Sequence, residues 1–144
     1  MRITKITLAF ITLGLVSLFS CVEEEEIIVP NVYVNFNISL DLPQFVALNS
    51  VNNSVKVPDE GYDDNGVIIY RFTLDEFLAF DATCPQHITI STSINLDDNG
   101  AAGTATCPHC QTTYSFFNFG QASSGYPLKR YKVKQSGSFL NVTN

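Results

Sequence analysis

Five residues that can bind a metal lie close together in the second half of the chain. The sequence contains four cysteines and two histidines. Apart from one cysteine near the N-terminus, all of them fall in two short clusters, Cys84-Pro85-Gln86-His87 and Cys107-Pro108-His109-Cys110. Thiolate sulfur and imidazole nitrogen are the ligands of tetrahedral zinc sites and of iron–sulfur centres. The spacing therefore predicts one shared metal site with the ligands Cys84, His87, Cys107 and Cys110.

The residues alone leave three states of this site open. The first is an iron–sulfur centre, and the second is a structural zinc ion held by three cysteines and one histidine, which is a common set. The third is a metal-free site closed by a disulfide, because exposed thiols pair in an oxidising compartment. A disulfide would use only two of the three thiols and leave the third unpaired. The odd number of cysteines therefore favours a metal site over a disulfide.

The second cluster also resembles the redox tetrapeptide of thiol oxidases related to thioredoxin. In those proteins the first thiolate is stabilised at the N-terminus of a helix. Here the segment after Cys110 is Gln-Thr-Thr-Tyr-Ser-Phe-Phe, which is rich in β-branched and aromatic residues and favours a strand over a helix. No βαβ pattern precedes it, so the sequence argues against a thioredoxin-like enzyme.

The segments around the two clusters are predicted to be short strands joined by turns. Alternating or β-branched runs predict strands at 32–38, 55–57, 67–72, 76–81, 88–94, 102–106, 113–117, 128–134 and 138–142. Pro43 begins a short stretch that can form one turn of helix, and the Asp-Asp-Asn-Gly run at 97–100 is typical of a hairpin turn. A hairpin is thus expected between the two clusters. The pattern predicts an all-β sandwich or barrel in which each cluster lies at a hairpin tip.

The N-terminal segment predicts export and lipid attachment. Arg2 and Lys5 precede an apolar run from Ile6 to Phe19 that is short for a membrane span, and the run ends in Leu-Phe-Ser-Cys, the pattern of a bacterial lipobox. We expect residues 1–20 to be a lipoprotein signal peptide and Cys21 to be acylated. An ordinary secretory signal or an uncleaved anchor helix is the alternative. Residues 21–30, with four glutamates at 23–26, are expected to form an acidic tether, and residues 31–144 the domain.

Charge excludes one large class of partner. Lys and Arg total 8 against 14 Asp and Glu, which gives a net charge of −6. A chain with this balance offers no basic surface for displacing counterions from phosphates, so a nucleic-acid partner is not expected.

Several further residues resemble the Rieske [2Fe–2S] domain family. The similarity is carried by Ala79-Phe80-Asp81-Ala82-Thr83-Cys84, by Cys107-Pro108 and Tyr114, and by the stretch Gly125-Tyr-Pro-Leu-Lys-Arg-Tyr-Lys-Val133. It is nearest to small Bacteroidetes lipoproteins with divergent cluster motifs. The resemblance implies that Cys84 and Cys107 match the two family cysteines. The two histidine positions of the family fall on Gln86 and Cys110.

The resemblance also implies roles for two neighbours of the cysteines and a function for the chain. Thr112 and Tyr114 stand where the family has side chains that hydrogen-bond to cluster sulfur, which tunes the potential. The expected function is one-electron transfer by a membrane-anchored, exported lipoprotein of the outer membrane, with a redox protein as partner. It would be a carrier more than a catalyst. The alternative is a degenerate Rieske fold that binds or supports a partner and is stabilised by zinc or a disulfide.

Overall fold

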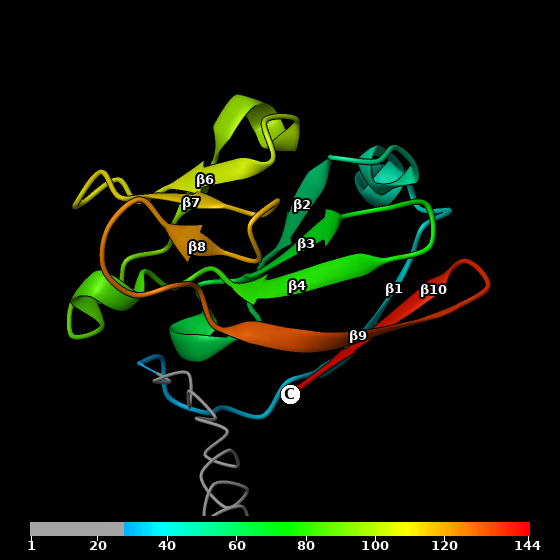
Figure 1. Ribbon diagram of the computed structural model, residues 1–144. Helices are drawn as coiled ribbons and strands as arrows, with labels where there is room; N and C mark the ends of the chain where they lie inside the picture. The colour runs from blue at the N-terminus through cyan, green and yellow to red at the C-terminus, as the bar shows by residue number, and fades with distance from the viewer. Residues whose placement is uncertain (1–27) are drawn as a thin grey trace, which may run out of the picture.

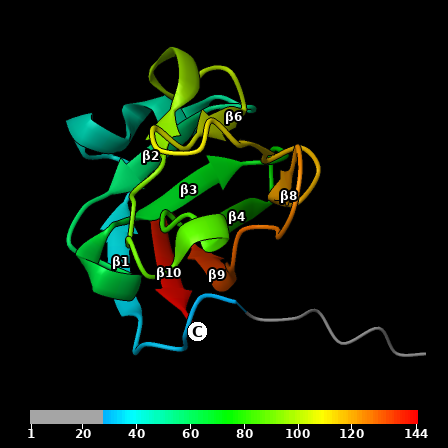
Figure 2. The ribbon, with the colours of Figure 1, turned by 90° about the vertical axis from the view of Figure 1, so that its left-hand side faces the viewer.

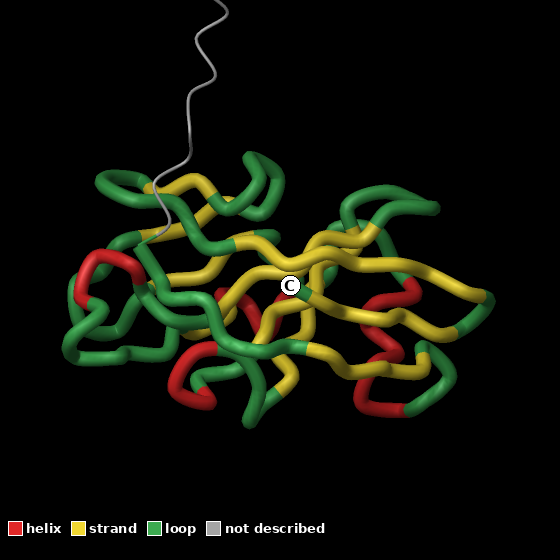
Figure 3. Tube along the Cα trace, turned by 90° about the horizontal axis from the view of Figure 1, so that it is seen from below, coloured by secondary structure: helices red, strands yellow, loops and turns green. Residues whose placement is uncertain are grey.

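The computed structural model describes residues 28–144 (Figure 1). Within this range the chain forms ten strands: β1 (Asn35–Ser39), β2 (Ser54–Val57), β3 (Val67–Arg71), β4 (Phe77–Asp81), β5 (Asn95–Leu96), β6 (Thr104–Thr106), β7 (Thr113–Ser115), β8 (Gln121–Ala122), β9 (Arg130–Ser136) and β10 (Phe139–Thr143). The helical segments are short 3-10 turns, η1 (Pro43–Asn49), η2 (Tyr62–Asp64), η3 (Pro85–His87) and η4 (Asp97–Gly100). Figure 3 shows the helical turns in red and the strands in yellow.

The strands form two sheets, and within residues 28–144 every pairing between them is antiparallel. One sheet has the order β1-β10-β9-β4-β3-β2, and the other has the order β5-β6-β7-β8. Figures 1 and 2 show the smaller sheet stacked beside β2, β3 and β4. The predicted all-β class is therefore confirmed.

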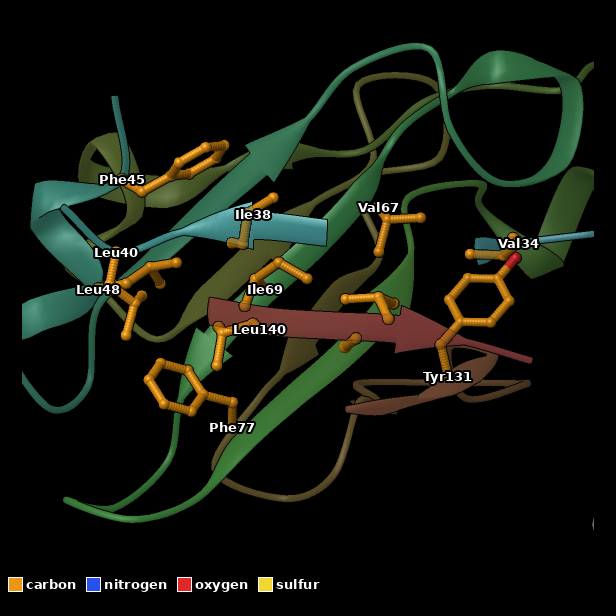
Figure 4. Packing of buried hydrophobic residues seen from close by; sticks show 12 residues of the cluster. Val34, Ile38, Leu40, Phe45, Leu48, Val67, Ile69, Phe77, Tyr131 and Leu140 are labelled. Carbon is orange, nitrogen blue, oxygen red and sulfur yellow. The ribbon is translucent and has the colours of Figure 1, made fainter. Parts of the chain in front are cut away.

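Strand β3 has both faces buried, because a hydrophobic core lies on each side of it. Val67 and Ile69 pack into the first core, against Leu140 of β10 and residues of β1 and η1 (Figure 4). Ile68 and Tyr70 point the other way into the second core. A strand buried on both faces reads as a continuous apolar run, and this explains the sequence Val-Ile-Ile-Tyr.

The second core lies between β3, β4 and the smaller sheet, and it includes two of the cysteines. Phe116 stacks on Phe80 with ring centroids 5.4 Å apart and also contacts Tyr70 at 5.4 Å. Cys84 and Cys107 are fully buried in this same cluster. The candidate ligands are thus part of the packing between the two sheets.

Most of the predicted strands coincide with strands of the structure to within a few residues. The expected strands at 67–72 and 76–81 are β3 and β4, and those at 113–117, 128–134 and 138–142 are β7, β9 and β10. The predicted turn of helix after Pro43 is η1. The predicted hairpin turn at 97–100 joins β5 to β6, where Gly100 has a φ of +95° and any Cβ would lie 2.1 Å from the Ser54 carbonyl oxygen.

The predicted strand at 88–94 is wrong. The Ile-Thr alternation has the period of a strand, but the chain turns twice here, since Ile90 N–H donates to His87 O and Ser91 N–H donates to Ile88 O. Only a single bridge between Thr83 and Ser93 remains. Lys56 Nζ secures the segment by donating to Ser93 Oγ at 3.2 Å and Ile94 O at 3.0 Å. These long-range bonds outweigh the local strand preference.

The predicted signal peptide, the acylated Cys21 and most of the acidic tether lie outside the described residues. Between residues 28 and 144, none of the helical segments is long and apolar enough to cross a membrane. At the other end, Asn144 donates from its side chain to Val32 O at 2.7 Å, so the C-terminus is fixed beside the start of the domain.

Candidate metal centre

The first ligand loop leaves the end of β4 and is closed like a hairpin. The bridge between Thr83 and Ser93 joins its two arms, and Cys84 N–H donates to Thr92 O at 2.9 Å. Pro85 then starts the 3-10 turn η3, because its fixed φ suits the first position of a helical turn. This turn brings His87 toward the surface while Cys84 stays buried.

The second ligand loop is the tip of the β6–β7 hairpin. Cys107 N–H donates to Thr112 O at 3.0 Å, and Gln111 N–H donates back to Cys107 O at 2.9 Å. Gln111 turns the chain with a φ of +60°. Cys107 is buried, Cys110 is partly exposed, and His109 between them is exposed. The hairpin thus holds one sulfur in the core and one near the surface.

The two loops bring three sulfurs together. The Sγ atoms of Cys84, Cys107 and Cys110 all lie within 4.8 Å of one another, and those of Cys84 and Cys110 are 3.7 Å apart. All three cysteines are free thiols. A tetrahedral zinc ion with bonds of about 2.3 Å to sulfur places its ligand atoms roughly 3.8 Å apart. The group can therefore hold a metal ion with little movement.

The three thiols differ in acidity because their surroundings differ. Burial raises the pKa of Cys84 to about 11, although the hydroxyl of Tyr114, 3.2 Å from its sulfur, acts in the opposite direction. Burial also disfavours ionisation of Cys110, but hydrogen bonds with Thr112 and with the other two thiols prevail and lower its pKa to about 7. Cys110 Sγ lies 3.2 Å from Thr112 Oγ1. Both side chains expected to contact sulfur therefore do so here.

The two histidines lie together beside the sulfur group. The ring centroids of His87 and His109 are 5.0 Å apart, and their planes are nearly perpendicular at 82°. Neither ring belongs to the close group of three sulfurs. His87 was predicted as a ligand and His109 was left without a role, but the structure places them as a pair.

Gln86 has a structural role that the sequence did not reveal. Its Nε2 donates to Tyr126 O at 2.8 Å, and its Oε1 accepts from Tyr126 N–H at 3.2 Å. Gly125 allows this contact, because a Cβ there would lie 2.0 Å from Gln86 Oε1. Gln86 therefore joins the first ligand loop to the loop before β9. The glycine preceding Tyr126 was the only signal available in the sequence.

Asp81 anchors the start of the first loop and was also missed as a site residue. It is fully buried, with Oδ1 accepting from Thr83 N–H at 2.8 Å. Its Oδ2 accepts from Tyr131 O–H at 2.5 Å and from Tyr62 N–H at 2.9 Å. An acid at the end of the apolar run Phe-Leu-Ala-Phe was the signal, since a buried carboxylate needs several donors. These bonds fix the backbone one residue before Cys84.

Comparison with known proteins gives the class of fold. No protein-family model matches the sequence, and no curated protein matches it. Among solved structures, the apo form of a quaternary ammonium Rieske monooxygenase, CntA, aligns at 15% identity over 83% of this chain with a TM-score of 0.54. The chain spans about a third of that enzyme, 34% of its length.

A second solved structure is similar over nearly its whole length. The ferredoxin of carbazole 1,9a-dioxygenase from Nocardioides aromaticivorans IC177 aligns at 16% identity over 78% of this chain and 97% of its own, with a TM-score of 0.47. The alignment with the monooxygenase CntA, with its TM-score of 0.54, shows that the domain has a Rieske-like fold. In this chain the fold carries a group of three cysteines with the geometry of a metal site.

Proposed function

We propose that this protein is a membrane-anchored electron-transfer protein that carries a [2Fe–2S] centre in its Rieske-like domain. The observation that supports it most directly is the meeting of three thiols from two loops of this fold, all within 4.8 Å. Such a centre accepts and donates one electron when it is bound. Its sulfur ligands would come from Cys84, Cys107 and Cys110, and His87 is the predicted imidazole ligand.

The donor set fits an iron–sulfur centre, but it does not follow the family arrangement position by position. A Rieske centre has two cysteines on one iron and two histidines on the other. At the two histidine positions this chain has Gln86 and Cys110. Gln86 is unavailable because its side-chain amide is bonded at both ends to Tyr126. Five donors remain in the two loops, which is enough for the four bonds that a centre needs.

The surroundings of the sulfurs suit a redox centre. The Tyr114 hydroxyl beside Cys84 and the Thr112 hydroxyl beside Cys110 can donate to thiolate sulfur, and such bonds tune the reduction potential. Burial of Cys84 and Cys107 excludes water from one side of the site, while partly exposed Cys110 marks the side that a redox partner can approach. Electrons would enter and leave at the tips of the two loops.

A single zinc ion is the second candidate, and the sulfur spacing favours it. The Cys84–Cys110 distance of 3.7 Å matches an edge of one zinc tetrahedron, in which sulfur ligands lie roughly 3.8 Å apart. In that case the domain would be a binding or structural module without redox activity.

The anchoring is proposed from the N-terminal sequence alone. Acylation of Cys21 would hold the exported protein on the outer membrane, facing either the periplasm or the exterior. Several acyl chains are needed, because one chain binds a bilayer only marginally. The glutamates at 23–26 would be repelled by anionic headgroups, so they suit a spacer better than a membrane contact.

Metal analysis of the full chain, purified without oxygen, tests the function. We expect about two irons and two sulfides per chain, with visible absorption at about 400–500 nm that bleaches on reduction. Stoichiometric zinc without sulfide would replace the proposal with the second candidate. Absence of any metal, together with a disulfide among the three thiols, would contradict both.

Two serine variants separate the site from the anchor. Cys84→Ser should abolish metal binding, whereas Cys21→Ser, the same change outside the site, should keep the metal and lose the acyl groups that mass spectrometry detects. Retention of the metal by Cys84→Ser would contradict the site. Absence of acyl groups on Cys21 of the unchanged chain would contradict acylation.

A further inference from the structure

We propose that the outward face of β9 binds the anionic headgroups of the membrane to which the chain is anchored. This inference rests on the proposed anchoring and adds a second contact with the same membrane. Arg130, Lys132 and Lys134 alternate along β9, and all three are exposed. Residues two apart on a strand point to the same side, so the three cations form one row. Tyr131 and Val133, which lie between them, point into the first core.

The strands beside this row add no negative charge to it. Lys132 and Lys134 pair with Thr143 and Asn141 of β10, and residues paired in this way share one face of the sheet. Every Asp and Glu between residues 28 and 144 lies outside β1, β9 and β10. The net charge of −6 predicted no basic surface, but the acidic residues that determine it lie elsewhere. The outward side of β9 is therefore basic.

The basic row is exposed because the smaller sheet covers another part of the larger one. Arg130 pairs with Phe80 of β4, and Phe80 lies in the second core between the two sheets. Figure 1 shows the smaller sheet beside β2, β3 and β4, which leaves β9 outside it. Asn35 and Asn37 of β1, at the far edge of the same sheet, are exposed as well. These exposed residues on β1 and β9 show that no other segment among residues 28–144 covers this face.

Exposed phenylalanine rings lie at both ends of the row. Arg130 Cζ lies 5.6 Å from the centroid of the Phe119 ring, which is 42% exposed. At the other end, Phe139 is 56% exposed and lies on the face of Lys134, because it pairs with Ser136, the next residue on that side of β9. Cations flanked by exposed aromatic rings suit the surface of a bilayer, where cations meet phosphates and apolar side chains enter the acyl region. Attraction to an acidic protein would not require the rings.

The proposed anchor holds this face close to a membrane. Lys129 Nζ donates to Pro30 O at 2.6 Å, so the described chain begins beside the start of β9, and Figures 1 and 2 both show it there. Cys21 precedes Pro30 by nine residues. An extended residue spans at most about 3.6 Å, so an acylated Cys21 keeps the start of β9 within about 32 Å of the bilayer. At so short a range, a few cations give appreciable binding that they would not give to a free protein.

A single tryptophan tests the contact, because the chain has no tryptophan of its own. The full chain with Phe139→Trp is reconstituted in phosphatidylglycerol vesicles whose acyl chains carry bromine, which quenches a tryptophan that enters the bilayer. We expect strong quenching in these vesicles and little in phosphatidylcholine vesicles with the same brominated chains. Val46→Trp is the matched control, because Val46 is exposed on η1, which packs on the first core at the opposite face of the larger sheet. It should stay unquenched in both.

Removal of the lysines tests whether charge holds the face to the bilayer. Lys132→Gln and Lys134→Gln are each combined with Phe139→Trp in the same vesicles. A lysine near an anionic surface contributes to binding, so each change should lower the ratio of docked to undocked molecules about fivefold. Sodium chloride at about 1 M should also abolish the quenching, because it screens charges within a few ångströms.

The outcomes separate this inference from the proposed function. An unquenched tryptophan at position 139 in phosphatidylglycerol vesicles overturns the proposal, and so does quenching that both lysine changes leave unaltered. If quenching appears only after the glutamates at 23–26 are replaced by glutamine, those glutamates occupy the face and the proposal is equally overturned. Metal analysis and mass spectrometry judge the centre and the acylation without this probe. A chain without acyl groups contradicts the anchor, and quenching by added vesicles then judges the face.

Discussion

The side-chain amide of Gln86 pairs with the backbone of Tyr126 as a second strand would, donating to its carbonyl and accepting from its N–H. One side chain therefore joins two loops that are 40 residues apart in the sequence. Gln86 lies in the loop that carries Cys84, so this link also holds the first ligand loop in place. Loss of the Gln86 side chain should therefore affect the stability of the domain.

Gln86→Ala should destabilise the domain. The change leaves a backbone donor and acceptor of Tyr126 without partners, and we expect the free energy of unfolding to fall by about 1 kcal/mol, because Gln86 is only partly buried. Urea denaturation of the metal-free chain measures it. Gln44→Ala, an exposed glutamine in η1, is the control. Equal stability of the two variants would show that the link contributes nothing.

Gly125→Ala tests the close approach to Gln86. Gly125 has a φ of +81° and a Cβ there would meet Gln86 Oε1, whereas Gly137 has a φ of +60° and open space around its Cβ position. Both alanine variants carry backbone strain, so the difference between them isolates the contact. We expect Gly125→Ala to lose about 1–3 kcal/mol more than Gly137→Ala in the same denaturation assay. A difference near zero would contradict the packing described here.

Asp81→Asn should be among the most damaging single changes. The buried carboxylate accepts three hydrogen bonds, from Thr83, Tyr131 and Tyr62, and an amide cannot accept all three in the same way. We expect a loss of about 2–4 kcal/mol by denaturation. Asp75→Asn, an exposed acid before β4, should change the stability by less than about 0.5 kcal/mol. If both variants behave alike, Asp81 does not anchor the loop.

The thiols of the metal-free chain should react in a fixed order as pH rises. Thiolate is the reactive form, so a thiol with a pKa of about 7 is half ionised at neutral pH, and one with a pKa of about 11 is almost fully protonated there. Alkylation of Cys110 should therefore level off above about pH 8. Alkylation of Cys84 should still be rising at about pH 10. Peptide mapping after timed alkylation measures both, and the reverse order would contradict the assigned environments.

The sequence predicted the fold well where local pattern and packing agree. The Val-Ile-Ile-Tyr run of β3 is buried on both faces, and such a run admits few other structures. The sequence failed at 88–94, where the local alternation was overruled by Lys56 from a distant strand. Local periodicity carries no information about a donor more than 30 residues away.

The sequence predicted which cysteines meet at the candidate site, but it did not predict how the other side chains are arranged around them. Clustered cysteines showed which residues would meet, because few other roles suit them. The spacing could not show that Gln86 is held by Tyr126 or that His109 lies against His87, since both depend on how three loops meet. Whether a side chain binds metal or joins two loops is decided by tertiary contacts.

Cys84 and Cys107 belong to the same packed cluster as Phe80 and Phe116. A buried free cysteine behaves as a small apolar residue, so these two side chains fill space in the core whether or not a metal is present. The hydrophobic core of the domain is therefore complete without a bound metal. In evolutionary terms, such a chain can exchange one metal for another, or lose it altogether, in single steps that each leave a folded protein.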